Sequence, residues 1–246
     1  MKKNIPNMLT CCNLLSGCIA VVSALHANFS QALLFIIIGA VFDFFDGMVA
    51  RLLHVSSPIG KELDSLADVV TFGVAPSMMI FAYTAESLQL GSPEFSMIFS
   101  ENSINSWHAI LCFLTLIMAA FSAVRLAKFN LDERQSMGFI GLPTPANALF
   151  WAALIAGPGT KHHILSGNPD LIYVVLLMVF ISCYLLVSEI PMFALKFKTW
   201  GWHGNEIKYI FLLTSVLLIV FLGIAGIAAV IAWYVVLSVI TALYNK

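Results

Sequence analysis

The sequence predicts an all-α fold: one polytopic integral membrane domain over residues 1–246, built as a bundle of about eight transmembrane helices. Composition and segment length predict it. Hydrophobic residues make up 60% of the chain and charged residues only 10%, whereas soluble domains carry about 25% charged residues. Apolar stretches also recur at close to the roughly 20 residues that a span needs. Glycine- or serine-rich linkers are absent, so no attached soluble module is expected.

Eight apolar segments account for the expected spans. They cover residues 8–28, 32–53, 65–88, 107–128, 142–157, 171–190, 208–225 and 227–244. The first follows Met-Lys-Lys, and because further apolar segments come after it we expect a retained span and not a cleaved signal. The short fifth begins at two prolines, which a first helical turn tolerates. The last two form one run, divided at Gly223-Ile-Ala-Gly226; without that division the count is seven.

The basic residues orient these spans. If the N-terminus is cytoplasmic, eleven of the twelve Lys and Arg residues fall on the cytoplasmic side, and Lys161 is the one outside. The external 89–106 loop then has two glutamates and no Lys or Arg. We therefore expect an integral protein of a bacterial or archaeal cell membrane, embedded in the lipid bilayer. The net charge of −1 gives no reason to expect a nucleic-acid partner.

Four aspartates lie together where the second and third spans meet. Asp43 and Asp46 precede the turn at 54–58, and Asp64 and Asp68 follow it. A charged side chain within a span costs about 2.5–3.5 kcal/mol, so four of them need a compensating partner. A divalent metal is the natural one. In the orientation above, all four aspartates lie at the cytoplasmic ends of their spans.

The spacing of this segment places the acidic residues on two facing stripes, because helical residues three or four apart share a face. The stripes contain Asp43, Asp46, Gly47, Ala50 and Arg51 on one helix, and Gly60, Asp64 and Asp68 on the next. Hard cations such as Mg²⁺ bind carboxylates and substrate phosphates together, and two metals about 3.5–4 Å apart assist phosphoryl transfer. Arg51 offers a donor fork for phosphate, and the glycines leave room for a bulky anion.

This spacing, Asp43-x2-Asp46-Gly47-x2-Ala50-Arg51-x8-Gly60-x3-Asp64-x3-Asp68, resembles the signature of the CDP-alcohol phosphatidyltransferases. Members of that family are membrane enzymes that transfer a phosphatidyl or related group from a CDP-linked donor to an acceptor hydroxyl and release CMP. The resemblance implies that the four aspartates hold two divalent ions, Mg²⁺ or Mn²⁺, and that Asp68 is also the general base. It further implies that the CDP group of the donor substrate contacts Gly47, Arg51, Ser57 and Gly60. The resemblance also implies a homodimer.

Softer matches resemble the phosphatidylserine synthase branch of the family. They are the segments 5–10, 63–76, 125–130 and 141–146. The branch implies CDP-diacylglycerol and L-serine as substrates. Arg125 and Asn130 would then hold the acceptor, since an arginine suits its carboxylate, and Asn7 and Thr10 would contact the cytosine. Each has a simpler interpretation: Arg125 could be a positive-inside anchor, Asn130 could end its helix, and Asn7 and Thr10 could cap theirs.

Other functions stay open at this point. The same chemistry could use glycerol 3-phosphate or an inositol phosphate as acceptor, because further basic residues are available nearby. A cation or proton transporter could also use intramembrane aspartates. A transporter is expected to distribute charged residues along several spans. Here the acidic residues of the motif gather at one end, and the last two predicted spans carry almost no charged residues. A structural scaffold would leave the aspartates unexplained.

Overall fold

The computed structural model describes residues 4–55, 57–87, 107–132, 139–157, 171–193, 201 and 205–244, and the statements below concern these residues. The expected all-α fold is confirmed. The elements are α1 (Asn4–Leu25), α2 (Phe29–Leu52), α3 (Pro58–Asp68), the π-helix η1 (Val69–Val74), α4 (Ala75–Ser87), α7 (Trp107–Leu114), α8 (Ile117–Leu131), α9 (Thr144–Ala156), α10 (Leu171–Val187), α11 (Glu206–Leu222) and α12 (Ala225–Tyr244), with two-residue strands β1 (Phe139–Ile140) and β2 (Pro191–Met192).

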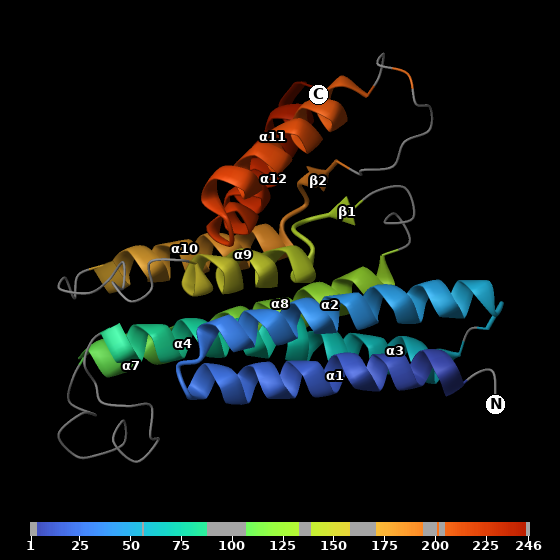
Figure 1. Cartoon of the computed structure of the whole chain (residues 1–246), viewed down its shortest axis with the longest axis horizontal. Coiled ribbons are helices and arrows are strands. Elements are labelled where there is room, and N and C mark those ends of the chain that lie inside the picture. Colours follow the sequence, from blue (N-terminus) through green and yellow to red (C-terminus); the bar gives the residue numbers. More distant parts are fainter. Residues whose placement is uncertain are drawn as a thin grey trace.

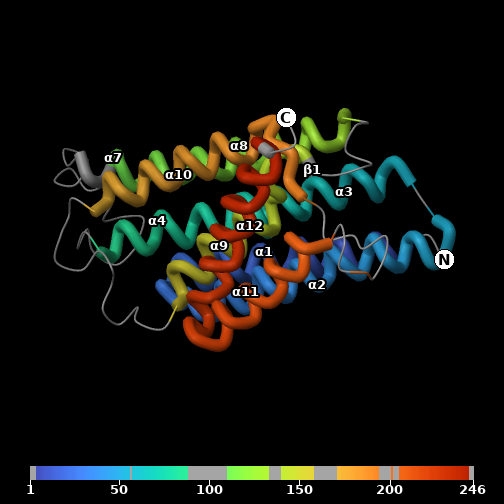
Figure 2. The backbone as a smooth tube through the Cα atoms, turned by 90° about the horizontal axis from the view of Figure 1, so that it is seen from above, coloured from blue at the N-terminus to red at the C-terminus, as the bar shows by residue number. Residues whose placement is uncertain are grey.

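Most helices share one direction, and the last two cross it. Helix α1 packs along α2 and also against α3, η1 and α4, while α8 packs against η1 and α10. Helix α9 contacts α2, α4 and η1 on one side and α12 on the other. In Figures 1 and 2, α11 and α12 form a hairpin that runs across the axis of the other helices. The nine described helical elements that precede α11 therefore make the bundle that contains the aspartates.

The membrane character of the chain is clear, although the number of spans stays a prediction. Five helices are long and apolar enough to cross a membrane: residues 4–25, 29–52, 58–87, 110–131 and 225–243. Helices α9 and α10 are apolar but shorter, and α11 has 17 residues. The division of the last apolar run occurs where expected, because α11 ends at Leu222 and α12 begins at Ala225. The turn includes Gly223 with φ of +58°, a value that favours glycine.

The turn between α2 and α3 has local sequence causes. Helix α2 ends after Leu52, and His54 takes a positive φ of 52°. Ser57 is the N-cap of α3, and its hydroxyl oxygen accepts a hydrogen bond from the Gly60 backbone N–H at 2.9 Å. Pro58 follows at the first helical position, where its missing N–H costs nothing. These residues start the second acidic stripe directly beside the end of the first.

Close contact between helices is concentrated at Thr71, within η1. A Cβ on Gly17 of α1 would lie 2.8 Å from the Thr71 Cα, and a Cβ on Gly39 of α2 would meet the Thr71 methyl group. The buried Thr71 hydroxyl donates to the Asn13 carbonyl of α1 at 3.0 Å. π-Helical turns are rare and occur frequently at functional sites. Here η1 begins at the residue after Asp68 and fixes α1 and α2 against it.

The strand pair joins the connection between α8 and α9 to the connection between α10 and α11. Strands β1 and β2 are antiparallel, with Phe139 opposite Met192. Gly141, which follows β1, has φ of +75°, and a Cβ there would lie 2.9 Å from the carbonyl oxygens of Leu186 and Ser188. Only glycine suits both the conformation and the crowding. The residues that follow α10 are thereby held against the start of α9.

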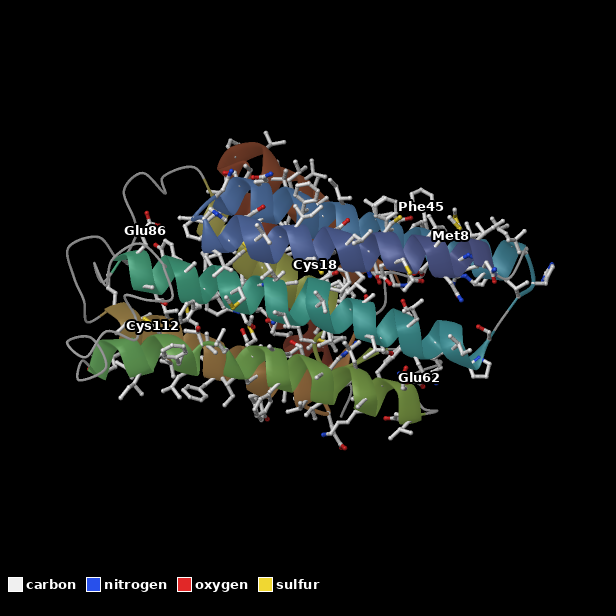
Figure 3. All side chains as sticks on the ribbon, turned by 90° about the horizontal axis from the view of Figure 1, so that it is seen from below. Met8, Cys18, Phe45, Glu62, Glu86 and Cys112 are labelled. Carbon is white, nitrogen blue, oxygen red and sulfur yellow. The ribbon has the colours of Figure 1, made fainter. Side chains whose placement is uncertain are left out.

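The carboxylate-bearing ends of the helices lie at one end of the bundle. In Figure 3, Met8, Phe45 and Glu62 lie at this end, and Glu86 and Cys112 lie at the other. Lys61 joins it to α8, because its Nζ donates to the Asn130 carbonyl at 2.9 Å. Of the twelve Lys and Arg residues, Lys2, Lys3, Arg134, Lys161, Lys196, Lys198 and Lys246 lie outside the described residues. The eleven-to-one bias thus stays a sequence observation.

We predict that Gly17→Ala destabilises the protein, because the new methyl group would collide with the Thr71 backbone, which cannot move without shifting η1. Overpacking of this kind costs about 1–3 kcal/mol. Thermal unfolding in detergent measures the loss. Gly201→Ala is the matched control, since a Cβ at Gly201 would meet no atom of the described residues within 4 Å. Equal melting temperatures for the two variants would contradict this account of the packing.

Candidate active site

Three of the four motif aspartates converge. Carboxylate oxygens of Asp43, Asp64 and Asp68 all lie within 4.8 Å of one another. Asp43 comes from α2, and the other two come from successive turns of α3. Asp68 is buried, and the other two are half-buried. The two stripes therefore face each other across the α2–α3 contact.

Such a cluster is stable only if a proton or a cation offsets its negative charge. Two ionised carboxylates this close repel by about 3–4 kcal/mol at an effective dielectric constant of about 20. Three such pairs approach the whole folding free energy of a typical domain, about 5–15 kcal/mol. The guanidinium of Arg125 on α8 interacts electrostatically with Asp68, but one cation cannot balance three anions. In addition, Asp64 Oδ1 is buried without a hydrogen-bond partner among the described residues. The cluster thus fits a divalent metal in both charge and ligand type.

Helix α1 supplies a hydrogen bond to each acidic stripe. The Thr10 hydroxyl donates to Asp46 Oδ2 at 2.6 Å, and the Asn13 amide donates to Asp68 Oδ1 at 3.0 Å. Thr10, Asn13, Asp46 and Asp68 are all buried. This interaction explains why Asp46 does not belong to the group of three: its carboxylate is turned to Thr10 and lies beside that group. Asn13 can act on the chemistry only through Asp68, which makes it a positioning residue.

A cavity of about 270 Å³ opens next to these carboxylates. It lies between α1, the end of α2 and the start of α3. Its walls are Pro6, Asn7, Thr10, Asp46, Gly47, Ala50, Val55, Ser57, Gly60, Lys61 and Asp64. Five residues for which the sequence suggested nucleotide contacts are among them: Asn7, Thr10, Gly47, Ser57 and Gly60.

The two glycines of the motif shape this cavity differently. A Cβ on Gly47 would have no atom within 4 Å, so the missing side chain leaves open space in the cavity wall. A Cβ on Gly60 would lie 3.0 Å from Ser57 Oγ and 3.1 Å from Asn7 Oδ1. Gly60 therefore allows α1 to approach the start of α3. Neither glycine has a positive φ, so Gly60 is favoured by close contact and Gly47 only leaves the cavity wider.

Arg51 and Asn130 are placed differently from the other candidates. Arg51 is exposed on the last turn of α2 and is not among the residues that line the cavity. The Asn130 amide donates to Ser65 Oγ at 2.7 Å, so in this structure it joins α8 to α3. Arg125 is 6% exposed, stacks over the Phe129 ring at 4.9 Å, and has one buried Nη atom without a partner among the described residues.

Sequence reasoning missed two residues here. Asn13 is a single polar residue in an apolar helix, and it lies outside the acidic segment. Its signal was the stripe of polar and small residues on α1 at Thr10, Asn13, Gly17 and Ala20, which repeats every three to four residues. Lys61 lines the cavity one residue after Gly60, and its Nζ donates to the Asn130 carbonyl of α8. Besides Arg51 on α2, which the sequence suggested, α3 therefore contributes Lys61 as a second basic residue in this region.

The part of the chain that forms this site also matches a family of known proteins. Residues 3–200, which include both acidic stripes and all residues of the site above, match the family model described as CDP-alcohol phosphatidyltransferase. The chain belongs to the CDP-alcohol phosphatidyltransferase family. Members of this family generally depend on divalent metal ions. The matched region ends before α11, so the crossing hairpin lies outside it.

Several curated relatives in this family are named CDP-diacylglycerol–serine O-phosphatidyltransferase. One from Bacillus subtilis (strain 168) is 40% identical over 141 residues, which is 57% of this chain and 69% of the relative. One from Helicobacter pylori (strain ATCC 700392 / 26695) is 30% identical over 98% of this chain and 94% of the relative. One from Saccharomyces cerevisiae (strain ATCC 204508 / S288c) is 37% identical over 56% of this chain and 48% of the relative.

We predict that Asp64→Asn weakens Mn²⁺ binding by at least about tenfold, because it removes one charge from a cluster that has too few compensating groups. Electron paramagnetic resonance of free Mn²⁺, titrated with purified protein in detergent, measures the affinity. Glu62→Gln is the control: it removes the same charge from an exposed position on the same helix (Figure 3). Equal affinity in Asp64→Asn and the unaltered protein would mean that the cluster holds no metal.

Proposed function

We propose that this protein transfers the phosphatidyl group of CDP-diacylglycerol to the hydroxyl of L-serine, giving phosphatidylserine and CMP. The observation that carries the proposal is the convergence of Asp43, Asp64 and Asp68 beside a cavity that α1, α2 and α3 enclose. Membership of the CDP-alcohol phosphatidyltransferase family gives the reaction class. The names of the Bacillus and Helicobacter relatives favour serine as the acceptor. On this proposal, residues 1–246 act as one catalytic domain.

The donor nucleotide is proposed to occupy the cavity between α1, α2 and α3. Asn7 and Thr10 would contact the base from α1. Ser57 and Gly60 would contact the diphosphate at the N-terminus of α3, where free backbone N–H groups favour anions. Gly47 would leave the space that the nucleotide fills, and Lys61 adds a positive charge in the same wall. Arg51, exposed at the rim, would reach the phosphates from outside.

Asp68 is proposed as the general base. It is the most buried of the three clustered carboxylates, and the Asn13 amide fixes the orientation of its carboxyl group. In the reaction, Asp68 accepts the proton of the acceptor hydroxyl while the oxygen bonds to the lipid-linked phosphorus. The bond from that phosphorus to the CMP oxygen breaks, and the electron pair leaves with CMP. A positioned base of this kind contributes about 10²–10⁴-fold to a rate.

Divalent ions complete the proposed site. Asp43, Asp46, Asp64 and Asp68 are the residues that would hold two Mg²⁺ or Mn²⁺ ions, and bound ions supply the charge that stabilises the diphosphate oxygens. Asp46 would also keep its hydrogen bond from Thr10, which fixes the orientation of its carboxylate. The clustering of Asp43, Asp64 and Asp68 and the buried, unpartnered Asp64 Oδ1 among the described residues support this proposal.

The site is proposed to face the cytoplasm of a bacterial or archaeal cell, with the protein as a homodimer in the bilayer. The bias of Lys and Arg to one side supports the orientation. Arg51, Lys61, Arg125 and Lys128 all lie at the helix ends near the carboxylates. In this orientation a lipid-linked donor places its acyl chains in the cytoplasmic leaflet and its nucleotide in the cavity.

A test of the proposed function measures CMP release by the purified protein. We expect CMP release to require CDP-diacylglycerol, L-serine and a divalent ion, and to stop with EDTA. Glycerol 3-phosphate and inositol phosphate, supplied in place of serine, distinguish the alternative acceptors. Release with one of these and none with serine would assign a different acceptor. No release with any alcohol, in a protein that remains folded, would refute the transferase activity.

We predict that Asp68→Asn lowers kcat by at least about 10²-fold, because the amide keeps the shape of the carboxyl group but cannot accept the proton. Initial rates of CMP release at saturating serine and CDP-diacylglycerol measure the effect. The melting temperature in detergent shows whether the variant still folds, and Glu62→Gln serves as the charge control on the same helix. Near-normal turnover in Asp68→Asn would remove Asp68 from the role of base.

A further inference from the structure

Arg125 lines a second cavity, separate from the one between α1, α2 and α3. It has a volume of about 400 Å³ and lies between the C-terminal ends of α8 and α10. Its walls are Arg125, Lys128, Leu131, Asp132, Ile140, Leu186, Val187, Ser188 and Glu189. None of these residues lines the first cavity. The two cavities are therefore lined by different helices, and the second is linked to the carboxylate cluster through Arg125, which interacts electrostatically with Asp68.

Arg125 distinguishes this second cavity from a simple surface hollow, because it places a buried guanidinium in the wall. Its side chain is 6% exposed, and one Nη atom is buried without a hydrogen-bond partner among the described residues. An unpartnered guanidinium nitrogen in a buried position is costly, and a bound anion would remove the cost. The same guanidinium interacts electrostatically with Asp68. Arg125 therefore links the wall of the second cavity to the proposed base.

Charges of both signs line the cavity. Arg125 and Lys128 lie on consecutive turns of α8, whereas Glu189 follows α10 and Asp132 follows α8. The C-terminal end of α10, which the cavity wall includes, adds a partial negative charge. A dianionic phosphate would suit the basic residues but would be repelled by Glu189 and Asp132. A molecule with an anionic and a cationic group suits both sides.

The backbone around Gly141 fixes the acidic side of the cavity. The Gly141 N–H donates to the Ile190 carbonyl at 2.9 Å, and the Leu142 N–H donates to the Leu185 carbonyl at 2.9 Å. These bonds hold the segment that carries Glu189 against the start of α9. Gly141 also has a positive φ, and a Cβ there would meet three carbonyl oxygens within 3.2 Å, which exclude a side chain. The backbone that carries the exposed Glu189 side chain is thus held in place beside the cavity that Arg125 lines.

We propose that this second cavity binds the α-amino-acid part of the acceptor, with its carboxylate on Arg125 and its ammonium group on Glu189. The inference rests on the proposed function and deepens it, because it assigns the residues that select an amino acid over other alcohols. Lys128 adds to the anion side and Asp132 to the cation side. With the serine carboxylate on Arg125, the serine hydroxyl would be directed towards Asp68, with which Arg125 interacts electrostatically. Glu189 thereby determines specificity without contacting the reacting phosphorus.

The test compares acceptors in unaltered protein, Glu189→Gln and Glu62→Gln. Ethanolamine lacks the carboxylate of serine, and 3-hydroxypropanoate lacks its ammonium group. We expect Glu189→Gln to raise the KM for serine by about tenfold and to leave the KM for CDP-diacylglycerol unchanged, since one charge-assisted contact of about 1.4 kcal/mol is lost. The preference for serine over 3-hydroxypropanoate should fall by a similar factor. Glu62→Gln, an exposed charge outside both cavities, should change neither value.

A second variant tests the anion side. Arg125→Lys keeps the charge but loses the planar donor fork, so the KM for serine should rise while ethanolamine, which has no carboxylate, is affected less. Binding of radiolabelled L-serine to Arg125→Lys reports on the site even where turnover is lost. Serine use with an unchanged KM in both variants would overturn the assignment of the cavity and leave the proposed function intact. Absence of serine-dependent CMP release from unaltered protein would instead refute the proposed function itself.

Discussion

Mutual repulsion among Asp43, Asp64 and Asp68 is the constraint on which the arrangement of the bundle depends. Their oxygens lie within 4.8 Å of one another in a surrounding that screens charge poorly. Holding them there requires several independent attachments of α3: Ser57 and Pro58 start the helix, Lys61 and Asn130 join it to α8, and α1 adds the Asn13 amide. The polar contacts between helices at this end thus serve to keep like charges together until a counter-charge binds.

Helix α1 connects this end of the molecule to its core. One stripe of α1 donates to Asp46 and Asp68 and then, a turn later, offers Gly17 to the η1 backbone. Hydrogen bonding at one end and close backbone packing further along therefore use the same helix face. Beyond Gly17 the stripe continues with Ala20 and Ala24, which belong to the apolar core that includes Trp151. Binding site and core are consequently parts of one continuous contact.

The sequence predicted the helical membrane fold and the two acidic stripes because both are periodic properties of short segments. Asp43 and Asp64 face each other as a spacing of three and four residues indicates. Three features depended on contacts between distant segments and could not be predicted in this way. Thr10 draws the Asp46 carboxylate away from the other three, Asn130 is occupied by Ser65, and α11 and α12 cross the bundle. Glu189 follows a helix without a recognisable motif, and the strand pair with the backbone bonds of Gly141 and Leu142 brings it to the cavity that Arg125 lines.

The π-helix after Asp68 separates two requirements that a regular helix would couple. A π turn takes up one more residue than an α turn, so the residues after η1 are rotated by about 100° relative to an uninterrupted α-helix. In consequence, α3 can direct its carboxylates towards α2 while α4 directs a nearly continuous buried surface, from Ala75 to Ala85, towards α1 and α9. A one-residue deletion within Val69–Val74 would merge the two registers. The chain would then be unable to satisfy both neighbours at once, however well each half is preserved.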